Sequence, residues 1–79
     1  MADLSAANLV RAGQVSGAIT TPAPADRPSV VVRRRDADGR EDDLTGVAHG
    51  WTSEHVLVMT DVGNVHHLAW WRAEDVRRG

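Results

Sequence analysis

The fold is decided by residues 54–72, which read Glu-His-Val-Leu-Val-Met-Thr-Asp-Val-Gly-Asn-Val-His-His-Leu-Ala-Trp-Trp-Arg. In the first seven of these residues, the β-branched Val56 and Val58 are spaced two apart, so they share one face of a β-strand, and His55, Leu57 and Met59 share the other. The Asp-Val-Gly-Asn sequence at 61–64 is typical of a tight turn, because glycine and asparagine accept positive φ angles. Residues 65–72 alternate again and predict a second strand, so the whole stretch predicts an antiparallel hairpin.

A second hairpin is predicted upstream of the first. Residues 30–35 read Val-Val-Val-Arg-Arg-Arg, a β-branched run that becomes polar, and Asp-Ala-Asp-Gly at 36–39 supplies a turn. A further strand is expected over 43–50, followed by a short connection at 52–53. Gly46, Ala48 and Gly50 lie on one face of that strand, and Thr45, Val47 and His49 on the other. Small residues on one face predict the close approach of another backbone or a bend at a barrel corner.

The chain divides into an N-terminal extension over 1–19, a proline-rich linker over 20–28 and a β-domain over 29–79. The linker reads Thr-Thr-Pro-Ala-Pro-Ala-Asp-Arg-Pro, and its prolines exclude a regular helix or a central strand. A domain of roughly 50 residues buries only about 60% of its unfolded surface. We therefore expect it to need further apolar contacts, from the extension or from a second copy of the chain.

The extension itself has two interpretations. Asp3 or Ser5 can cap a short helix that runs to about Ala12, with Gly13 as its stop. Residues 14–20 are equally readable as a short strand. An element docked on the barrel and a mobile tail are both compatible with this sequence.

Four short antiparallel strands joined by tight turns make a meander, which buries its apolar face by curling into a barrel. Four motifs accompany this pattern: Gly-Val-Ala-His-Gly-Trp at 46–51, His-Val-Leu-Val at 55–58, the turn at 61–64 and Trp-Trp-Arg-Ala-Glu-Asp-Val-Arg at 70–77. On these residues the segment 28–79 resembles the bacterial Src-homology-3-like small barrels, including relatives with Tudor-like or KOW-like geometry. The last motif falls where that fold places a short helical turn before its final strand. The resemblance implies an all-β fold, a small antiparallel barrel with an N-terminal extension.

The composition is that of an ordinary globular domain, with 42% hydrophobic and 25% charged residues and a formal net charge of −2. Cysteine is absent, which excludes disulfides, thiol catalysis and thiolate metal sites. No apolar stretch approaches the ~18 residues of a membrane span, and the first residues lack the pattern of a secretory signal. We therefore expect a cytoplasmic protein that does not associate with membranes.

Three tryptophans and one arginine are the candidate partner-binding residues: Trp51, Trp70, Trp71 and Arg72. Because Trp70 and Trp71 are adjacent on a predicted strand, their side chains point to opposite faces, so that one fills the core and the other is exposed. Exposed aromatic residues dominate binding hot spots. We expect a small non-catalytic interaction module that binds a protein partner, or itself as a homo-oligomer, through an exposed tryptophan and an open strand edge.

A nucleic-acid-binding accessory protein is the alternative function. Its candidate residues are five arginines: Arg33, Arg35, Arg72, Arg77 and Arg78. Guanidinium groups suit phosphate, and Arg33 and Arg35 share one face of their strand. The acids at 41–43 stand across the turn and are expected to pair with the arginine triplet 33–35. This pairing, together with the net negative charge, opposes a phosphate-binding surface.

The sequence offers no pattern for catalysis. It contains no glycine-rich phosphate loop and no serine nucleophile elbow. Three imidazoles on one sheet face, from His49, His55 and either His66 or His67, are the only arrangement considered for zinc, but this spacing is not a recognised ligand pattern. We expect ordinary polar histidines, no metal, no cofactor, no small-molecule substrate and no enzymatic activity.

Overall fold

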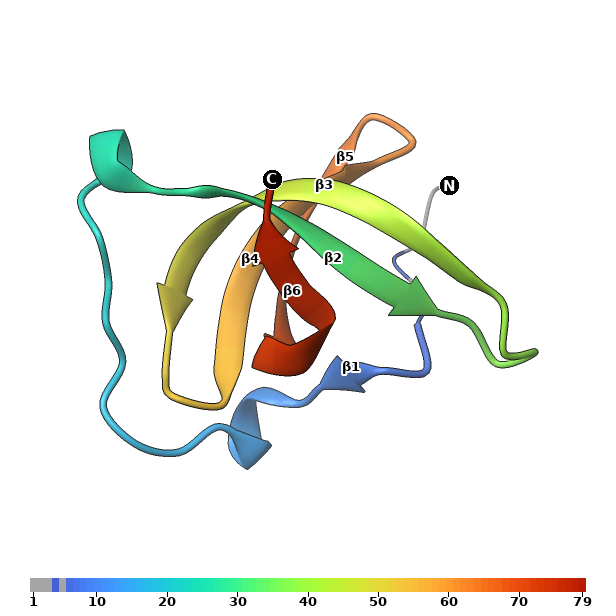
Figure 1. The fold of residues 1–79 in the computed structure, drawn as a ribbon, viewed down its shortest axis with the longest axis horizontal. Helices are drawn as coiled ribbons and strands as arrows, with labels where there is room; N and C mark the ends of the chain where they lie inside the picture. Colours follow the sequence, from blue (N-terminus) through green and yellow to red (C-terminus); the bar gives the residue numbers. More distant parts are fainter. Residues whose placement is uncertain (1–3, 5) are drawn as a thin grey trace.

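The computed structural model describes Leu4 and residues 6–79 of the chain. In this part of the chain, six strands form one antiparallel sheet in the order β1-β5-β4-β3-β2-β6. Their bounds are β1 (Leu9–Val10), β2 (Ser29–Arg35), β3 (Glu41–Trp51), β4 (His55–Val62), β5 (Val65–Arg72) and β6 (Val76–Arg78). The sheet curls into a half-barrel, which Figure 1 shows. The predicted fold class, a small antiparallel all-β barrel, is confirmed.

The β4–β5 hairpin is the one predicted from residues 54–72. Its two-residue loop consists of Gly63 and Asn64, whose φ angles are 58° and 65°. Two consecutive positive φ angles define the type I′ turn, whose twist matches that of the flanking strands. β4 extends two residues beyond the predicted strand, because Val62 still pairs with Val65.

The β2–β3 hairpin turns where the sequence predicts it, at residues 36–39. The Asp36 carboxylate accepts hydrogen bonds from the backbone N–H groups of Asp38 and Arg40, each at 2.9 Å, and Gly39 has a φ of +83°. Side-chain bonds of this kind let aspartate organise a turn locally. β3 begins at Glu41, earlier than predicted, because Glu41 pairs with Arg35.

The C-terminal segment closes the meander onto its first strand. The helical turn predicted at 73–76 is present as a single 3₁₀ turn, η3 (Ala73–Asp75). β6 follows it and pairs antiparallel with β2, with Val76 opposite Val32. A short helical turn before the last strand is what the sequence led us to expect, whereas the pairing of β6 with β2 was not predicted.

The N-terminal extension is docked on the sheet. β1 pairs with β5, with Leu9 opposite Trp71, and Asn8 forms hydrogen bonds with β2. The predicted helix ending near Ala12 is wrong over the described residues, because Leu9–Val10 is a strand; its proposed caps Asp3 and Ser5 lie outside them. A 3₁₀ turn, η1 (Ala12–Gln14), follows β1.

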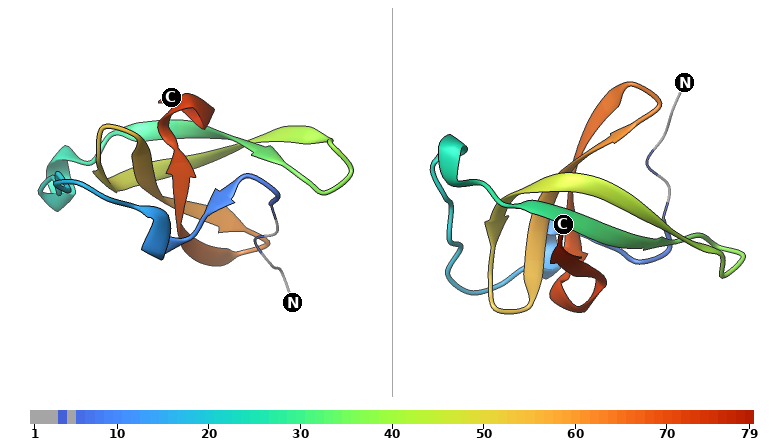
Figure 2. Two further views of the ribbon diagram at one scale, coloured as in Figure 1. Left: turned by 90° about the horizontal axis from the view of Figure 1, so that it is seen from below. Right: turned by 45° about the horizontal axis from the view of Figure 1, so that its top comes forward.

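The linker then passes around the outside of the sheet from β1 to β2 (Figures 1 and 2). The strand considered for 14–20 is reduced to an isolated bridge between Thr20 and Trp51. The proline-rich stretch contains one 3₁₀ turn, η2 (Pro24–Asp26), with Pro24 at its start, where the missing N–H costs nothing. The Pro28 carbonyl accepts a hydrogen bond from the Ala48 N–H at 2.9 Å, which directs the chain into β2.

A small apolar core fills the concave side of the sheet. Five of the described hydrophobic residues are buried there: Val30, Val32, Ala48, Val58 and Trp71. Partly buried Leu4, Ala6 and Leu9 pack against them, so the extension supplies part of the core. Gly46 is needed at this point because a Cβ there would lie 2.5 Å from the Met59 carbonyl oxygen. This is the close backbone approach that its small-residue face predicted.

One predicted feature of β3 is wrong. Gly46, Ala48 and Gly50 do not share a face, because the register with β4 shifts between Ala48 and Gly50. After this β-bulge, Gly50 opposes Leu57 and Trp51 opposes Val56. A β-bulge adds one residue to a strand, so the side chains after it point to the face opposite to the one that simple alternation predicts. Here the bulge directs Trp51 to the concave side.

Candidate functional site

The two adjacent tryptophans of β5 have opposite environments. Trp71 is fully buried at the centre of the core, and it pairs with Val56 of β4 on one side and Leu9 of β1 on the other. Trp70 is half-buried on the convex side of the sheet. Trp71 is therefore a core residue that no partner reaches in this structure, and Trp70 is the tryptophan available for contact.

Four cross-strand pairs lie along the convex side of the β4–β5 hairpin, and we call them the hairpin outer face. In order along the strands they are His55–Arg72, Leu57–Trp70, Met59–Leu68 and Asp61–His66. The two central pairs are apolar, and the Leu68 residue is 52% exposed. The Asp61 carboxylate and the His66 Nδ1 are in contact, and both side chains are largely exposed. This face has an apolar centre and polar ends, which is the organisation of many protein-binding surfaces.

An open edge borders the hairpin outer face. β1 pairs with β5 only at Trp70 and Trp71. Among the described residues, the stretch Val65–Ala69 is therefore paired with β4 alone and presents backbone groups on its other side. Val65 and Leu68 on this stretch are 40% and 52% exposed. Unpaired strand edges of this kind accept a strand from another chain.

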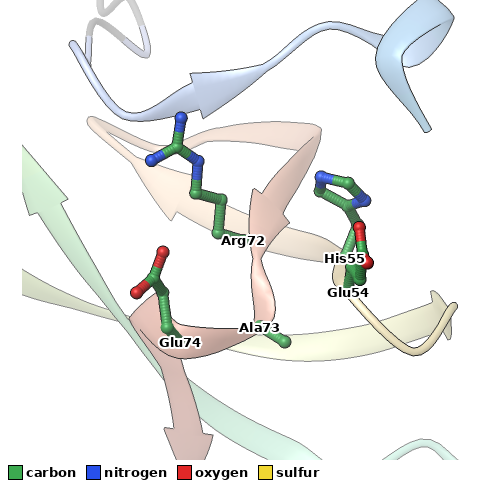
Figure 3. A pocket seen from close by; sticks show the side chains of 5 residues that line it. All are labelled: Glu54, His55, Arg72, Ala73 and Glu74. Carbon is green, nitrogen blue, oxygen red and sulfur yellow. The ribbon is translucent and has the colours of Figure 1, made fainter.

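Arg72 lies at the end of the hairpin outer face beside a polar pocket of about 350 Å3. The pocket is lined by Glu54, His55, Arg72, Ala73 and Glu74, which Figure 3 shows around the end of β5. Within the described part of the chain, Arg72 forms no salt bridge, and the buried His55 Nδ1 has no hydrogen-bond partner. The exposed Arg72 guanidinium is thus available to pair with an acidic group from another molecule, whereas the His55 Nδ1 is buried.

Trp51 lies apart from Trp70 and Arg72. It is half-buried and packs against the core, and the bridge to Thr20 holds its backbone. Together with residues of β2, β4 and β6, including Arg77 and Arg78, it lines an apolar pocket of about 190 Å3. This volume is below the ~300 Å3 at which small-molecule sites begin.

The acids of the β2–β3 hairpin neutralise much of the predicted arginine surface. Arg34 forms two hydrogen bonds with Asp42, at 2.9 and 2.6 Å, and the Arg35–Glu41 salt bridge is 2.8 Å long. Hydrogen bonding from the Arg34 side chain holds the pKa of Asp42 below its usual range. The expected pairing of the triplet with the acids at 41–43 is therefore confirmed for two of its three arginines.

Arg33, the remaining arginine of the triplet, does not pair with the acid opposite it, because an arginine of β6 binds that acid. Arg33 stands opposite Asp43 in the register, but the Asp43 carboxylate accepts a hydrogen bond from Arg77 of β6 at 2.8 Å. That bond also lowers the pKa of Asp43. Of the five alternative phosphate-binding residues, Arg35 and Arg77 are thus engaged with acids. Within the described residues, Arg33, Arg72 and Arg78 form no salt bridge.

The histidines do not gather at one point. His55 pairs with Arg72 at one end of the hairpin, whereas His66 and His67 lie opposite Asp61 and Thr60 at the other. Over residue 4 and residues 6–79, no group of three or more histidine, aspartate or glutamate side chains is placed to hold a metal ion. His49 has a lowered pKa, caused first by desolvation and then by the nearby charge of Arg27.

The sequence analysis missed the apolar surface of the hairpin outer face and the role of Asn8 beside β2. Leu57 and Met59 were placed on one strand face, but their union with Leu68 and Trp70 into one apolar surface was not anticipated. The signal for it is present in the sequence, because both faces of residues 55–59 are apolar. Asn8, which joins β1 to β2, carries no sequence signal that distinguishes it.

Comparison of the chain with protein-family models, with curated proteins and with solved structures finds no match. Among the described residues, no helix is long and apolar enough to span a membrane.

Proposed function

We propose that this protein is a small non-catalytic interaction module that binds a protein partner, or itself, through the hairpin outer face and the open edge of β5. The observation that carries the proposal is the position of half-buried Trp70 and exposed Leu68 on one convex surface, directly beside a strand edge that no other described strand pairs with. We place the module in the cytoplasm, in keeping with its cysteine-free composition, as an accessory or regulatory subunit.

The two parts of this surface act differently. Backbone groups of Val65–Ala69 supply hydrogen bonds to an added strand, and such bonds give affinity with little sequence preference. Trp70 and Leu68 supply apolar contact area, and Arg72 at its end supplies a charged contact. The combination lets one partner be held by its backbone and selected by its side chains.

The alternative function, nucleic-acid binding through the arginines, is supported by the exposed positions of Arg33, Arg72 and Arg78. These three arginines come from β2, β5 and β6. The other two candidates are neutralised by acids, Arg35 by Glu41 and Arg77 by Asp43. Phosphate binding requires steep salt dependence, with log K falling against log salt by about 0.7–0.9 for each phosphate contacted. Absence of binding to DNA and RNA oligonucleotides at about 50 mM salt removes this alternative.

The experiment is a pull-down with the tagged chain from lysate of its source cells, divided into nuclease-treated and untreated halves. We expect a protein at a stoichiometric level in both halves, and its loss with Trp70→Ser. Ser16→Ala is the matched control, because Ser16 is exposed and lies outside the surface. Recovery that disappears on nuclease treatment contradicts the proposal and favours the arginine surface.

A further inference from the structure

We propose that the partner of the hairpin outer face is a second copy of this chain, packed face to face as a symmetric dimer. The inference rests on the proposed function and names the occupant of its surface. It is carried by the order of the four cross-strand pairs on that face.

The order of these pairs is complementary to its own reverse. Arg72 lies at one end, the two apolar pairs occupy the centre, and Asp61 lies at the other end. A twofold axis that crosses the hairpin at right angles to its strands reverses this order in the second copy. β5 then lies over β5 of the second copy, so each Arg72 meets the end of the other face that carries His66 and, one strand to the side, Asp61. Leu57, Met59, Leu68 and Trp70 of both chains meet in the middle.

The same operation satisfies the charges at both ends. Arg72 has no salt bridge in the described chain, and the Asp61 side chain is 67% exposed beside His66. A packing with the strands of the two copies parallel brings the two ends that carry Arg72 together and the two ends that carry Asp61 together, with like charges about one strand spacing apart, which costs energy. Glu54 and Glu74 line the pocket beyond the last cross-strand pair, so Arg72 is the charge that lies within the face.

The small core gives self-association a physical benefit. Only one of the five buried core residues, Trp71, is large, and no disulfide supports the fold. Burial of apolar surface contributes about 25 cal/mol per Å2, so covering Leu68 and its neighbours adds to the stability that this core provides. Small domains commonly reach sufficient stability through oligomers.

The size of the face sets the strength of the dimer. From His55 to Asp61 the hairpin spans about 20 Å at ~3.4 Å per residue, and two strands are about 10 Å wide. This is smaller than the roughly 800 Å2 per partner of a standard interface. The dimer is therefore expected to be of the weak, reversible class.

The test is a charge exchange between the two ends of the face, read by sedimentation equilibrium. The chain is studied from about 5 μM to about 500 μM at a pH of about 8, where ordinary histidine is neutral. We expect Arg72→Glu and Asp61→Arg each to weaken self-association about tenfold or more, and the double variant to recover to within about threefold of the original chain. Arg40→Glu is the control, because Arg40 is exposed in the β2–β3 turn and reverses the same charge far from the face.

Three outcomes overturn the inference. The chain remains a monomer throughout; or it associates but both single exchanges leave the association unchanged; or the double variant stays as weak as the single ones. The near-ultraviolet circular dichroism of buried Trp71 shows whether each variant is folded. If the chain is a monomer but still captures a protein from lysate through Trp70, the dimer is contradicted and the proposed function stands. If the chain neither associates with itself nor captures a protein through Trp70, both the dimer and the proposed function are contradicted.

Discussion

The side-chain amide of Asn8 donates a hydrogen bond to the backbone carbonyl of Arg33 at 2.7 Å, which joins the N-terminal extension to β2. The Asn8 side-chain oxygen also accepts from the Arg35 N–H at 2.9 Å. The neighbouring Ala7 N–H donates to the Arg35 carbonyl as well. Because β1 pairs with β5 on its other side, Asn8 connects two strands that are far apart in the sheet order.

We expect Asn8→Ala to lower the free energy of unfolding by about 1–2 kcal/mol, since two backbone groups of β2 lose their partners. Urea unfolding followed by tryptophan fluorescence measures the change. Ser16→Ala, an exposed position beyond β1, is the control and is expected to change stability by less than about 0.5 kcal/mol. Equal stability of the two variants means that the hydrogen bonds between Asn8 and β2 do not contribute to the stability of the fold.

Gly46 is expected to be intolerant of any side chain. An alanine Cβ there meets the Met59 carbonyl oxygen at 2.5 Å and a Val58 methyl group at 2.7 Å. Since backbone atoms must move to relieve the first contact, Gly46→Ala is expected to cost about 1–3 kcal/mol. Gly13→Ala is its matched control, because nothing lies within 4 Å of the Cβ at that position. Thermal unfolding of both variants measures the loss of stability. A Gly46→Ala variant as stable as the original chain contradicts the β3–β4 packing.

The two tryptophans are distinguished by the same conservative substitution. Trp71→Phe leaves a void in the core and is expected to destabilise the chain by about 1–3 kcal/mol. Its indole N–H has no hydrogen-bond partner among the described residues, so the loss reflects packing alone. Trp70→Phe on the convex side is expected to cost less than about 1 kcal/mol. A reversal of this order in urea unfolding contradicts the assignment of Trp71 to the core.

His49 makes stability depend on pH in the weakly acidic range. Its pKa in the folded chain lies below the ordinary value of 6.5, because of desolvation and then the charge of Arg27. As the pH falls through 6.5 the unfolded chain binds the proton first, so stability decreases until the folded chain is protonated too.

We therefore expect His49→Gln to lose less stability than the original chain between pH about 7.5 and about 5.5. Arg27→Gln is expected to have a smaller effect of the same sign, because desolvation is the larger cause of the lowered pKa. Denaturant titrations at a series of pH values measure this. Identical pH profiles for the three chains contradict the packing of His49.

Local patterns predicted most of the fold. Alternation around Val56 and Val58 gave the central strand, and the Gly63–Asn64 turn gave the hairpin, because both depend on neighbours in sequence. The bulge after Ala48 and the Arg77–Asp43 pair were not predictable, because each requires contact between strands that the sequence alone does not align. The adjacent tryptophans were predicted to face opposite sides, but only the packing of Leu9 and Val58 assigns the core side to Trp71.

The central claim is that the hairpin outer face is the protein-binding surface. It is tested most directly by amide-resolved NMR of the isotope-labelled chain, titrated with unlabelled chain and with any protein that the pull-down recovers. We predict that shift changes concentrate in residues 55–61 and 65–72. Changes confined to the β2–β3 hairpin over 33–43, or saturable binding that leaves residues 55–72 unchanged, contradict the claim.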